Sequence, residues 1–434
     1  MKAKAIFERI SQNSFLKQSF FTLFLRVSGA FLLFGFTVFL TKFFSAKTVG
    51  QYDFVRTFLL VVGSICLLGF DQSILYFKGK LASQNALEEV KVIYAKMIAM
   101  LFFTSLATLI IVLIIDKETI NDYFSDPEVY SIILKASVTL FFYGISVLNT
   151  EIFRALDKLY VAELFRNIIK YVPLILGSFA LFYYKKETYL VDVFLIGFVV
   201  LSIVSTFFVF VFFSKISAIK RTENFSTKEI FVKSYPIAIS GMALFLLMSF
   251  DILFLKKYWN DETVAFYSVG VKIMTIVSII IVTVNITVSA KISEHFSGQN
   301  KAELVRILKN SARAIFGITF PVILILSFFS EHILSFFGNQ YIAAKQAFLI
   351  LIIGQGICSA FGSASVYLNM TGRQQIFQII LLSAVILNFG LNRYLIPIYG
   401  MNGAAVAFVS STFFWNCISA IIIYRKDKVN IILH

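Results

Sequence analysis

Long apolar runs separated by short polar stretches make up most of this chain. A membrane-spanning helix needs about 20 mostly apolar residues, and the sequence contains twelve runs of that kind. The predicted helices cover residues 19–44, 53–77, 92–115, 130–153, 161–183, 191–214, 234–255, 264–289, 312–330, 342–369, 376–396 and 402–424. The pattern therefore predicts an all-α integral membrane protein with about twelve transmembrane helices.

The polar interruptions predict how these helices are grouped. The longest ones inside the chain are 215–233 and 290–311, and the first separates helix six from helix seven. We therefore expect an N-terminal six-helix lobe over 1–214, a cytoplasmic linker over 215–233 and a C-terminal six-helix lobe over 234–434.

A short pattern occurs at the corresponding place in each predicted lobe. Residues 48–52 read TVGQY and residues 263–267 read TVAFY, and each precedes or opens an apolar run. Each copy is followed by a cation inside the run, Arg56 in one and Lys272 in the other. Two lobes that start from the same side of the membrane are parallel repeats, related by a pseudo-twofold axis along the membrane normal, as in one class of transporter.

Composition and charge agree with a membrane location. The 434 residues are 59% hydrophobic and 15% charged, whereas about a quarter of the residues in a soluble protein are charged. The net charge of +15 would suggest nucleic acid in a soluble domain, but here we assign it to the cytoplasmic ends of the helices and expect no nucleic-acid partner. The three cysteines all fall in apolar segments, so no disulfide framework is expected.

The distribution of Lys and Arg predicts the orientation. The two tails and the even-numbered gaps hold twenty-two of these residues and the odd-numbered gaps hold six. The positive-inside rule then places both termini in the cytoplasm. Residues 1–18 are polar and basic, and the first apolar run is too long for a signal peptide, so no cleavable signal is expected.

Charged residues inside the predicted helices are candidate functional residues, because charge is costly in hydrocarbon. Arg26 and Asp71 lie at similar distances from the inner surface, and Asp251 and Lys272 lie at similar distances from the outer one. Each pair has two interpretations. The pairs are structural ion pairs between neighbouring helices, or the cations line a water-filled cavity and bind an anion such as phosphate.

Arg56 is the first candidate for contact with a ligand. It is fifteen residues from Asp71, roughly 22 Å along a helix, and no acid at its depth is evident in the first two helices. The alternative is that Arg56 extends to the nearby outer interface.

On helix five the i, i+3, i+7 spacing of Glu163, Arg166 and Lys170 predicts one charged face, with Lys170 deep in the membrane. The alternative is that helix five starts later in the chain, which would leave these three charges at the membrane interface.

Signals for catalysis are missing from the sequence. The three histidines, His295, His332 and His434, have no metal-ligand spacing, and no Gly-rich nucleotide-binding loop occurs. The external gaps are too short for a catalytic domain. We therefore expect no enzyme activity, no metal and no cofactor.

Several stretches in both lobes are informative when they are taken together. They are Arg26, 49–54 (VGQYDF), 68–71 (LGFD), 235–236 (YP), Asp251, 336–341 (FFGNQY), 343–344 (AA), 368–373 (LNMTGR), 388–392 (NFGLN) and 396–405 (IPIYGMNGAA). Together they resemble the polysaccharide-unit (Wzx-type) flippases, relatives of the MATE drug exporters and of the lipid II flippase. The resemblance implies a MATE-like fold of two six-helix lobes with a central cavity between them.

The same resemblance implies a function and a site. It implies a flippase that moves an undecaprenyl-pyrophosphate-linked oligosaccharide across the bacterial cytoplasmic membrane, by alternating access, for O-antigen or capsule synthesis. The positions that match its pyrophosphate-binding cations are Arg26, Arg56 and Lys272, and Lys170 is a further candidate. The acids Asp71 and Asp251 are structural or couple transport to H⁺ or Na⁺.

The resemblance also implies partners, which are the lipid-linked glycan, membrane lipid, a polysaccharide polymerase and a chain-length regulator.

Other functions remain open at this point. A MATE-type drug exporter would use cavity carboxylates, and the surplus of buried cations argues against it. A membrane-embedded polysaccharide polymerase or ligase would need a larger external loop. A structural scaffold explains the hydropathy but leaves the buried charges unexplained.

Overall fold

The computed structural model describes residues 14–83, 89–215 and 225–433. The basic N-terminal residues 1–13 and much of the expected linker therefore lie outside the described residues. Within the described part the chain is almost entirely helical, with no β-strand. An apolar segment in a membrane must satisfy its own backbone hydrogen bonds, and a helix does so within one segment.

The chain forms two compact units that differ from the expected lobes. Unit 1 comprises residues 1–44 and 58–242, and unit 2 comprises residues 45–57 and 243–434. The short segment Ser45–Thr57, which contains the TVGQY pattern, thus belongs to unit 2 although it lies early in the chain. The predicted division at residues 215–233 assigned this segment to the N-terminal lobe.

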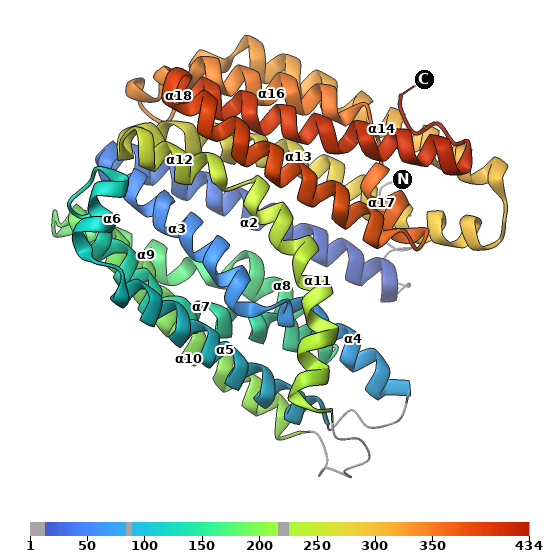
Figure 1. The fold of residues 1–434 in the computed structure, drawn as a ribbon, viewed down its shortest axis with the longest axis horizontal. Helices are drawn as coiled ribbons and strands as arrows, with labels where there is room; N and C mark the ends of the chain where they lie inside the picture. The colour runs from blue at the N-terminus through green and yellow to red at the C-terminus, as the bar shows by residue number, and fades with distance from the viewer. Residues whose placement is uncertain (1–13, 84–88, 216–224, 434) are drawn as a thin grey trace, which may run out of the picture. The chain divides into compact units, whose positions relative to one another are not determined.

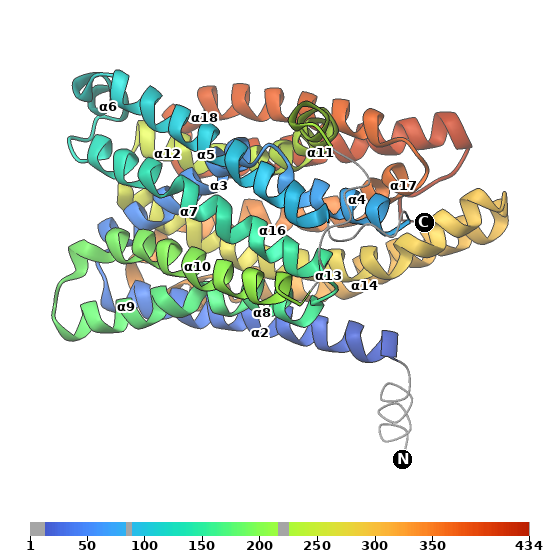
Figure 2. The same ribbon diagram turned by 90° about the horizontal axis from the view of Figure 1, so that it is seen from below.

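Unit 1 is a bundle of membrane-length helices. Its helices are α2 (Ser14–Phe43), α4 (Phe70–Ser83), α5 (Val90–Ile114), α6 (Lys117–Phe124), α7 (Val129–Ala155), α8 (Leu159–Asn167), α9 (Val172–Tyr183) and α10 (Leu190–Phe213), with two short 3₁₀ turns, η2 (Ile169–Tyr171) and η3 (Glu187–Tyr189). Helix α7 packs against α4, α5, α8 and α10, and α2 packs along α8 and α9, as Figure 2 shows. Two helices are shared between the units: α3 (Ala46–Leu67) begins in unit 2, and α11 (Thr227–Leu247) begins in unit 1.

Unit 2 contains the remaining helices. They are α12 (Phe250–Tyr258), α13 (Asp261–Ser297), α14 (Lys301–Phe328), α15 (Ser330–Ser335), η4 (Asn339–Ala344), α16 (Lys345–Ser359), α17 (Ala364–Met370) and α18 (Gln374–Asp427). Helix α18 packs against α12, α16 and α17, and α13 packs against α14 and α16. Buried residues such as Tyr367, Leu381 and Ile423 join α17 and both parts of α18 in one apolar core.

The number of membrane spans depends on how α18 is divided. Among the described residues, ten stretches are long and apolar enough to cross a membrane, and the broken pair of α11 and α12 makes eleven. Helix α18 has 54 residues, about 80 Å at the usual rise, whereas the hydrocarbon core is about 30 Å thick. It is interrupted at Gly400, with φ 53° and ψ −129°, and its two parts run side by side in Figure 1. Counting α18 as two spans gives twelve, the number expected from the sequence.

Two of the predicted transmembrane helices are broken within their length. Helix two is interrupted between α3 and α4, where Leu68 and Gly69 have φ values of 49° and 75°. Helix five is interrupted between α8 and α9, where the 3₁₀ turn η2 precedes Pro173. Proline removes a backbone donor and clashes with the preceding turn, which explains the second break. These breaks change which side chains face one another.

Gly50 lets the Ser45–Thr57 segment approach α13 closely within unit 2. A side-chain carbon at Gly50 would collide with the backbone carbonyl group of Asp261, the first residue of α13. Beside this contact, the Lys256 ammonium lies 2.6 Å from the Asp261 carboxylate, and both side chains are almost completely buried. This close approach holds the first turns of α3 against unit 2.

We predict that Gly50→Ala destabilises the protein, because either α3 or the start of α13 must shift. Overpacking of this kind typically costs about 1–3 kcal/mol, and we expect the unfolding temperature of the purified protein to fall by several degrees. Gly390→Ala is the control, since a carbon added there meets no atom within 4 Å and alanine favours a helix. Equal unfolding temperatures for the two variants would contradict the packing described here.

Candidate functional site

In each unit, a cluster of three or more charged side chains lies among the described residues of the membrane-spanning helices. The Arg26 cluster of unit 1 comprises Arg26, Glu151, Arg154, Glu163 and Arg166. The Asp53 cluster of unit 2 comprises Asp53, Arg56 and Lys272. The structure therefore brings Arg56 and Lys272 together and places Arg26 in a separate cluster.

Arg26 makes a two-pronged ion pair in unit 1. Its Nε donates to Glu163 Oε2 at 3.1 Å and its terminal NH2 donates to Oε1 at 2.9 Å. The amide of Asn167, one turn further along α8, donates to the same Oε2 at 2.9 Å. Glu163 is 1% exposed and the Arg26 side chain is 33% exposed. Two parallel hydrogen bonds fix the guanidinium plane and make this a rigid pair.

The remaining members of the Arg26 cluster surround Glu151 on α7. Arg166 of α8 pairs with one oxygen of Glu151, and Arg154 donates to the other at 2.8 Å. Asp71, in the first turn of α4, lies within electrostatic reach of Glu151 and Arg166. The expected pair between Arg26 and Asp71 is therefore wrong. The break at Leu68–Gly69 ends α3 and starts α4 just before Asp71, so depth along a straight helix was a poor guide to the partner.

The Asp53 cluster joins α3 to α13 inside unit 2. Lys272 Nζ lies 2.7 Å from Asp53 Oδ1 and 2.9 Å from Oδ2. Arg56, one turn after Asp53 on the same helix, has its NH1 3.9 Å from Oδ1. Asp53 is completely buried, whereas the Lys272 side chain is 10% and the Arg56 side chain 32% exposed. Two cations thus contact one buried carboxylate and remain partly accessible.

Asp251 does not pair with Lys272, contrary to the expectation. It lies in the first turn of α12 and is 1% exposed. The Tyr267 hydroxyl donates to Asp251 Oδ2 at 2.6 Å, and the backbone N–H of Ile252 donates to Oδ1 at 3.1 Å. The start of a helix favours a negative charge, which adds to these bonds. Lys272 and Asp251 were expected to pair because their predicted depths are similar, but the Lys272 ammonium pairs with Asp53 instead.

Lys170 does not share a regular helix face with Glu163 and Arg166. Helix α8 ends at Asn167 and Lys170 lies in η2, after Ile168 leaves helical geometry with φ −123° and ψ −62°. Lys170 is exposed, and its ammonium lies 4.8 Å from the centre of the Tyr171 ring. The i, i+3, i+7 prediction was wrong at its last residue because the helix breaks before it.

Two acids of the site, Asp53 and Glu151, were not predicted from the sequence. Asp53 was noted as part of a motif and not as a functional residue, although it precedes Arg56 by three positions and so shares its helix face. Glu151 lies near the end of a predicted helix and gave no signal of the two arginines that it contacts. No group of His, Cys, Asp and Glu that could hold a metal ion occurs in the part of the chain that the structure describes.

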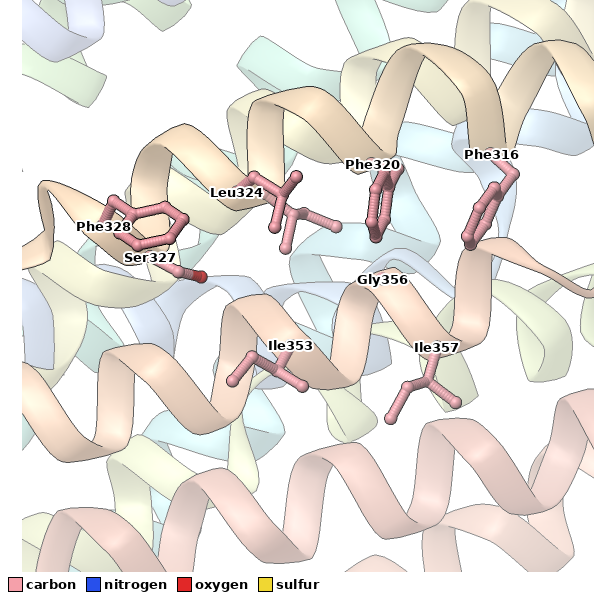
Figure 3. Close-up of a pocket in the computed structure, with 9 residues that line it drawn as sticks. Phe316, Phe320, Leu324, Ser327, Phe328, Ile353, Gly356 and Ile357 are labelled. Carbon is pink, nitrogen blue, oxygen red and sulfur yellow. The ribbon is translucent and has the colours of Figure 1, made fainter.

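An apolar cavity lies between α14 and α16 of unit 2, as Figure 3 shows. Its volume is about 550 Å³. The residues that line it are Phe316, Phe320, Ile323, Leu324, Ser327, Phe328, Ile353, Gly356 and Ile357. None of these nine side chains carries a charge, so this cavity cannot neutralise an anion.

Comparison with known proteins adds to this description. Residues 15–290 match the family described as "Polysaccharide biosynthesis protein", and residues 236–393 match the MatE family. A search of curated proteins found no match to the sequence.

Solved structures of transporters share the fold. The chain is similar to the lipid II flippase MurJ in an inward closed conformation, with a TM-score of 0.74 at 16% identity over 94% of this chain and 87% of that one. It is also similar to an inward-facing multidrug resistance MATE family transporter of the MOP superfamily, with a TM-score of 0.70 at 12% identity over 92% of this chain and 93% of that one. A third is the MATE multidrug transporter DinF-BH, with a TM-score of 0.65 at 14% identity over 94% of this chain and 93% of that one. These likenesses confirm the expected MATE-like helical membrane fold.

We predict that Glu163→Gln destabilises unit 1, because it leaves the half-buried Arg26 guanidinium without its counter-charge. Breaking a fully buried pair typically costs about 3–5 kcal/mol, and the partial exposure of Arg26 reduces the expected loss to about 2 kcal/mol. Thermal unfolding of the purified protein measures the effect. Glu331→Gln is the control, because its pair with Lys345 is exposed on both sides and such pairs contribute little. A Glu163→Gln variant as stable as the control would show that the pair is not structural.

Proposed function

Because the chain belongs to the polysaccharide biosynthesis protein family, we propose that it is a flippase for lipid-linked oligosaccharides. It carries undecaprenyl-diphosphate-linked repeat units across the bacterial cytoplasmic membrane, by alternating access, for O-antigen or capsule synthesis. The family match and the transporter fold support a multi-pass membrane exporter. The choice of substrate rests on the charges inside the membrane.

The observation that carries this proposal is the meeting of Arg56 and Lys272 at Asp53. A diphosphate is strongly anionic and needs cations in a region where water is scarce. Arg56 can offer its planar fork to phosphate oxygens, and Lys272 offers a point charge. Arg26 is the third proposed phosphate contact, through the exposed third of its side chain. Lys170, past the break in helix five, is at most a peripheral contact.

The orientation, partners and energy source are parts of the same proposal. Both termini face the cytoplasm, in keeping with the distribution of Lys and Arg. A polysaccharide polymerase and a chain-length regulator are the proposed protein partners, and the chain itself performs no catalysis. H⁺ or Na⁺ is the proposed coupling ion, and Asp71 is the better candidate to bind it because Asp251 is enclosed by its hydrogen bonds with Tyr267 and Ile252.

Export of cationic drugs is the second candidate function. The MatE match over residues 236–393 and the likeness to multidrug transporters favour it. A drug cation would need an accessible carboxylate, and in unit 2 Asp53 and Asp251 are both buried and already bonded. The cations of the Asp53 cluster are the more accessible groups, which favours an anionic substrate.

We predict that Lys272→Met and Arg56→Ala each abolish surface polysaccharide in a host that lacks its own copy of this gene. The reason is the loss of one positive charge at the proposed diphosphate site. Immunoblotting of surface glycan and of the tagged protein separates loss of transport from loss of protein. Lys272→Arg keeps the positive charge, so cells that carry this variant should still display part of the surface glycan.

Lys345→Met is the matched control, because it removes a lysine whose ion pair is exposed, and glycan display should stay normal. Normal display in Lys272→Met and Arg56→Ala, at normal protein levels, would overturn the site assignment. If the wild type exports a dye and these variants do not, while all of them display normal amounts of surface glycan, the drug exporter is favoured.

A further inference from the structure

Among the ion pairs that the described residues form with buried carboxylates, Lys256–Asp261, Arg26–Glu163 and Lys272–Asp53 differ in how firmly the cation is held. Lys256 and Asp261 are both sealed from solvent, with side-chain exposures of 2% and 5%. Arg26 is fixed by two parallel bonds to Glu163, which Asn167 also holds. Lys272 has only the Asp53 carboxylate as its ion-pair partner among the described residues, and its side chain keeps some exposure.

We propose that Asp53 is a resting counter-anion, which holds Lys272 until a phosphate of the substrate displaces it. This inference rests on the proposed function and names a further residue of its site. A carboxylate presents two negative oxygens to the ammonium, as a phosphate does. The ammonium of lysine is a point charge on a flexible four-carbon stem, so it can turn from one anion to another without the planar alignment that arginine requires.

The exchange needs a second group to satisfy Asp53 after Lys272 leaves, because an unpaired carboxylate is costly in a buried site. Two groups are in place. Arg56 NH1 is 3.9 Å from Asp53 Oδ1. The Tyr341 side chain is completely buried, and the Asp53 carboxylate lies within its electrostatic reach.

Tyr341 is suited to be the alternative donor. Its hydroxyl finds no hydrogen-bond acceptor among the residues that the structure describes. Buried polar groups are nearly always hydrogen-bonded, so an unsatisfied one calls for an explanation. A hydroxyl that donates to Asp53 only when Lys272 binds phosphate gives that explanation. Asp53 then exchanges Lys272 for Tyr341. Arg56 stays beside the carboxylate and has further N–H donors for phosphate, so the charge of the carboxylate never lacks a partner.

This arrangement has a consequence for transport. Competition from Asp53 weakens the binding of the diphosphate by Lys272 and returns the ammonium to the carboxylate when the substrate leaves. Asp53 therefore favours release at the expense of affinity. A carrier that binds its substrate too tightly releases it slowly, so removal of this competitor should raise affinity and slow transport.

The test measures binding of undecaprenyl diphosphate to the full-length protein in lipid nanodiscs, with undecaprenyl monophosphate as the comparison ligand. We expect Asp53→Asn to bind the diphosphate about tenfold more tightly than the wild type, a change of about 1.4 kcal/mol. In the glycan assay the same variant should display less polysaccharide. Lys272→Met should lose most of the binding, and Glu331→Gln should match the wild type.

A double-mutant cycle separates the exchange from a purely structural role. Tyr341→Phe keeps the resting ion pair and should weaken diphosphate binding several-fold, because the displaced carboxylate loses its donor. The same substitution should have no effect in the Asp53→Asn background. A structural role for Asp53 predicts lower thermal stability in Asp53→Asn without tighter binding.

The outcomes distinguish the two proposals. If neither the wild type nor any variant binds the diphosphate, the proposed function falls. If the wild type binds it and Lys272→Met does not, while Asp53→Asn binds equally or more weakly, the function stands and the counter-anion role is overturned. If Asp53→Asn fails to fold, Tyr341→Phe decides, since unchanged binding in that variant overturns the exchange.

Discussion

The cost of a charge in hydrocarbon is the constraint on which the charged part of this structure depends. An isolated ion in the bilayer core costs several kcal/mol or more, and the structure meets this cost by pairing. Glu163 holds Arg26, Asp53 holds Lys272, and Asp261 holds Lys256. Buried pairs contribute little net stability, yet they are costly to break on one side only. Each pair therefore fixes which helices lie together, more than it stabilises the fold.

The placement of Ser45–Thr57 in unit 2 explains how the Asp53 cluster forms. Gly50 allows α3 to approach the first residue of α13, where Asp261 also binds Lys256. One turn further along α3, Asp53 then reaches Lys272 on α13. The short chain segment that joins unit 2 thus delivers both the carboxylate and Arg56 to a cation on a helix from the second half of the chain.

The sequence predicted the membrane helices and identified Arg26, Arg56 and Lys272 as cations that lie within them. It did not predict their partners. Matching by depth assumed straight helices, and two of these helices break, at Leu68–Gly69 and after Asn167. Neighbouring helices were also assumed to pair, whereas Lys272 pairs with a helix of the first half of the chain. Partners set by such breaks and by long-range packing are not encoded in local spacing.

Transbilayer movement of the substrate is the most direct test of the proposed flippase function. The protein is reconstituted in liposomes that contain a fluorescent undecaprenyl-diphosphate-linked oligosaccharide, and a membrane-impermeant reagent reports how much label has changed leaflets. We expect movement well above that in protein-free liposomes, with the undecaprenyl monophosphate analogue moved much more slowly. The doubly neutral variant with Asp53→Asn and Lys272→Met, which leaves no unpaired charge between these residues, should not accelerate movement. Equal rates with and without the wild-type protein would contradict flippase activity.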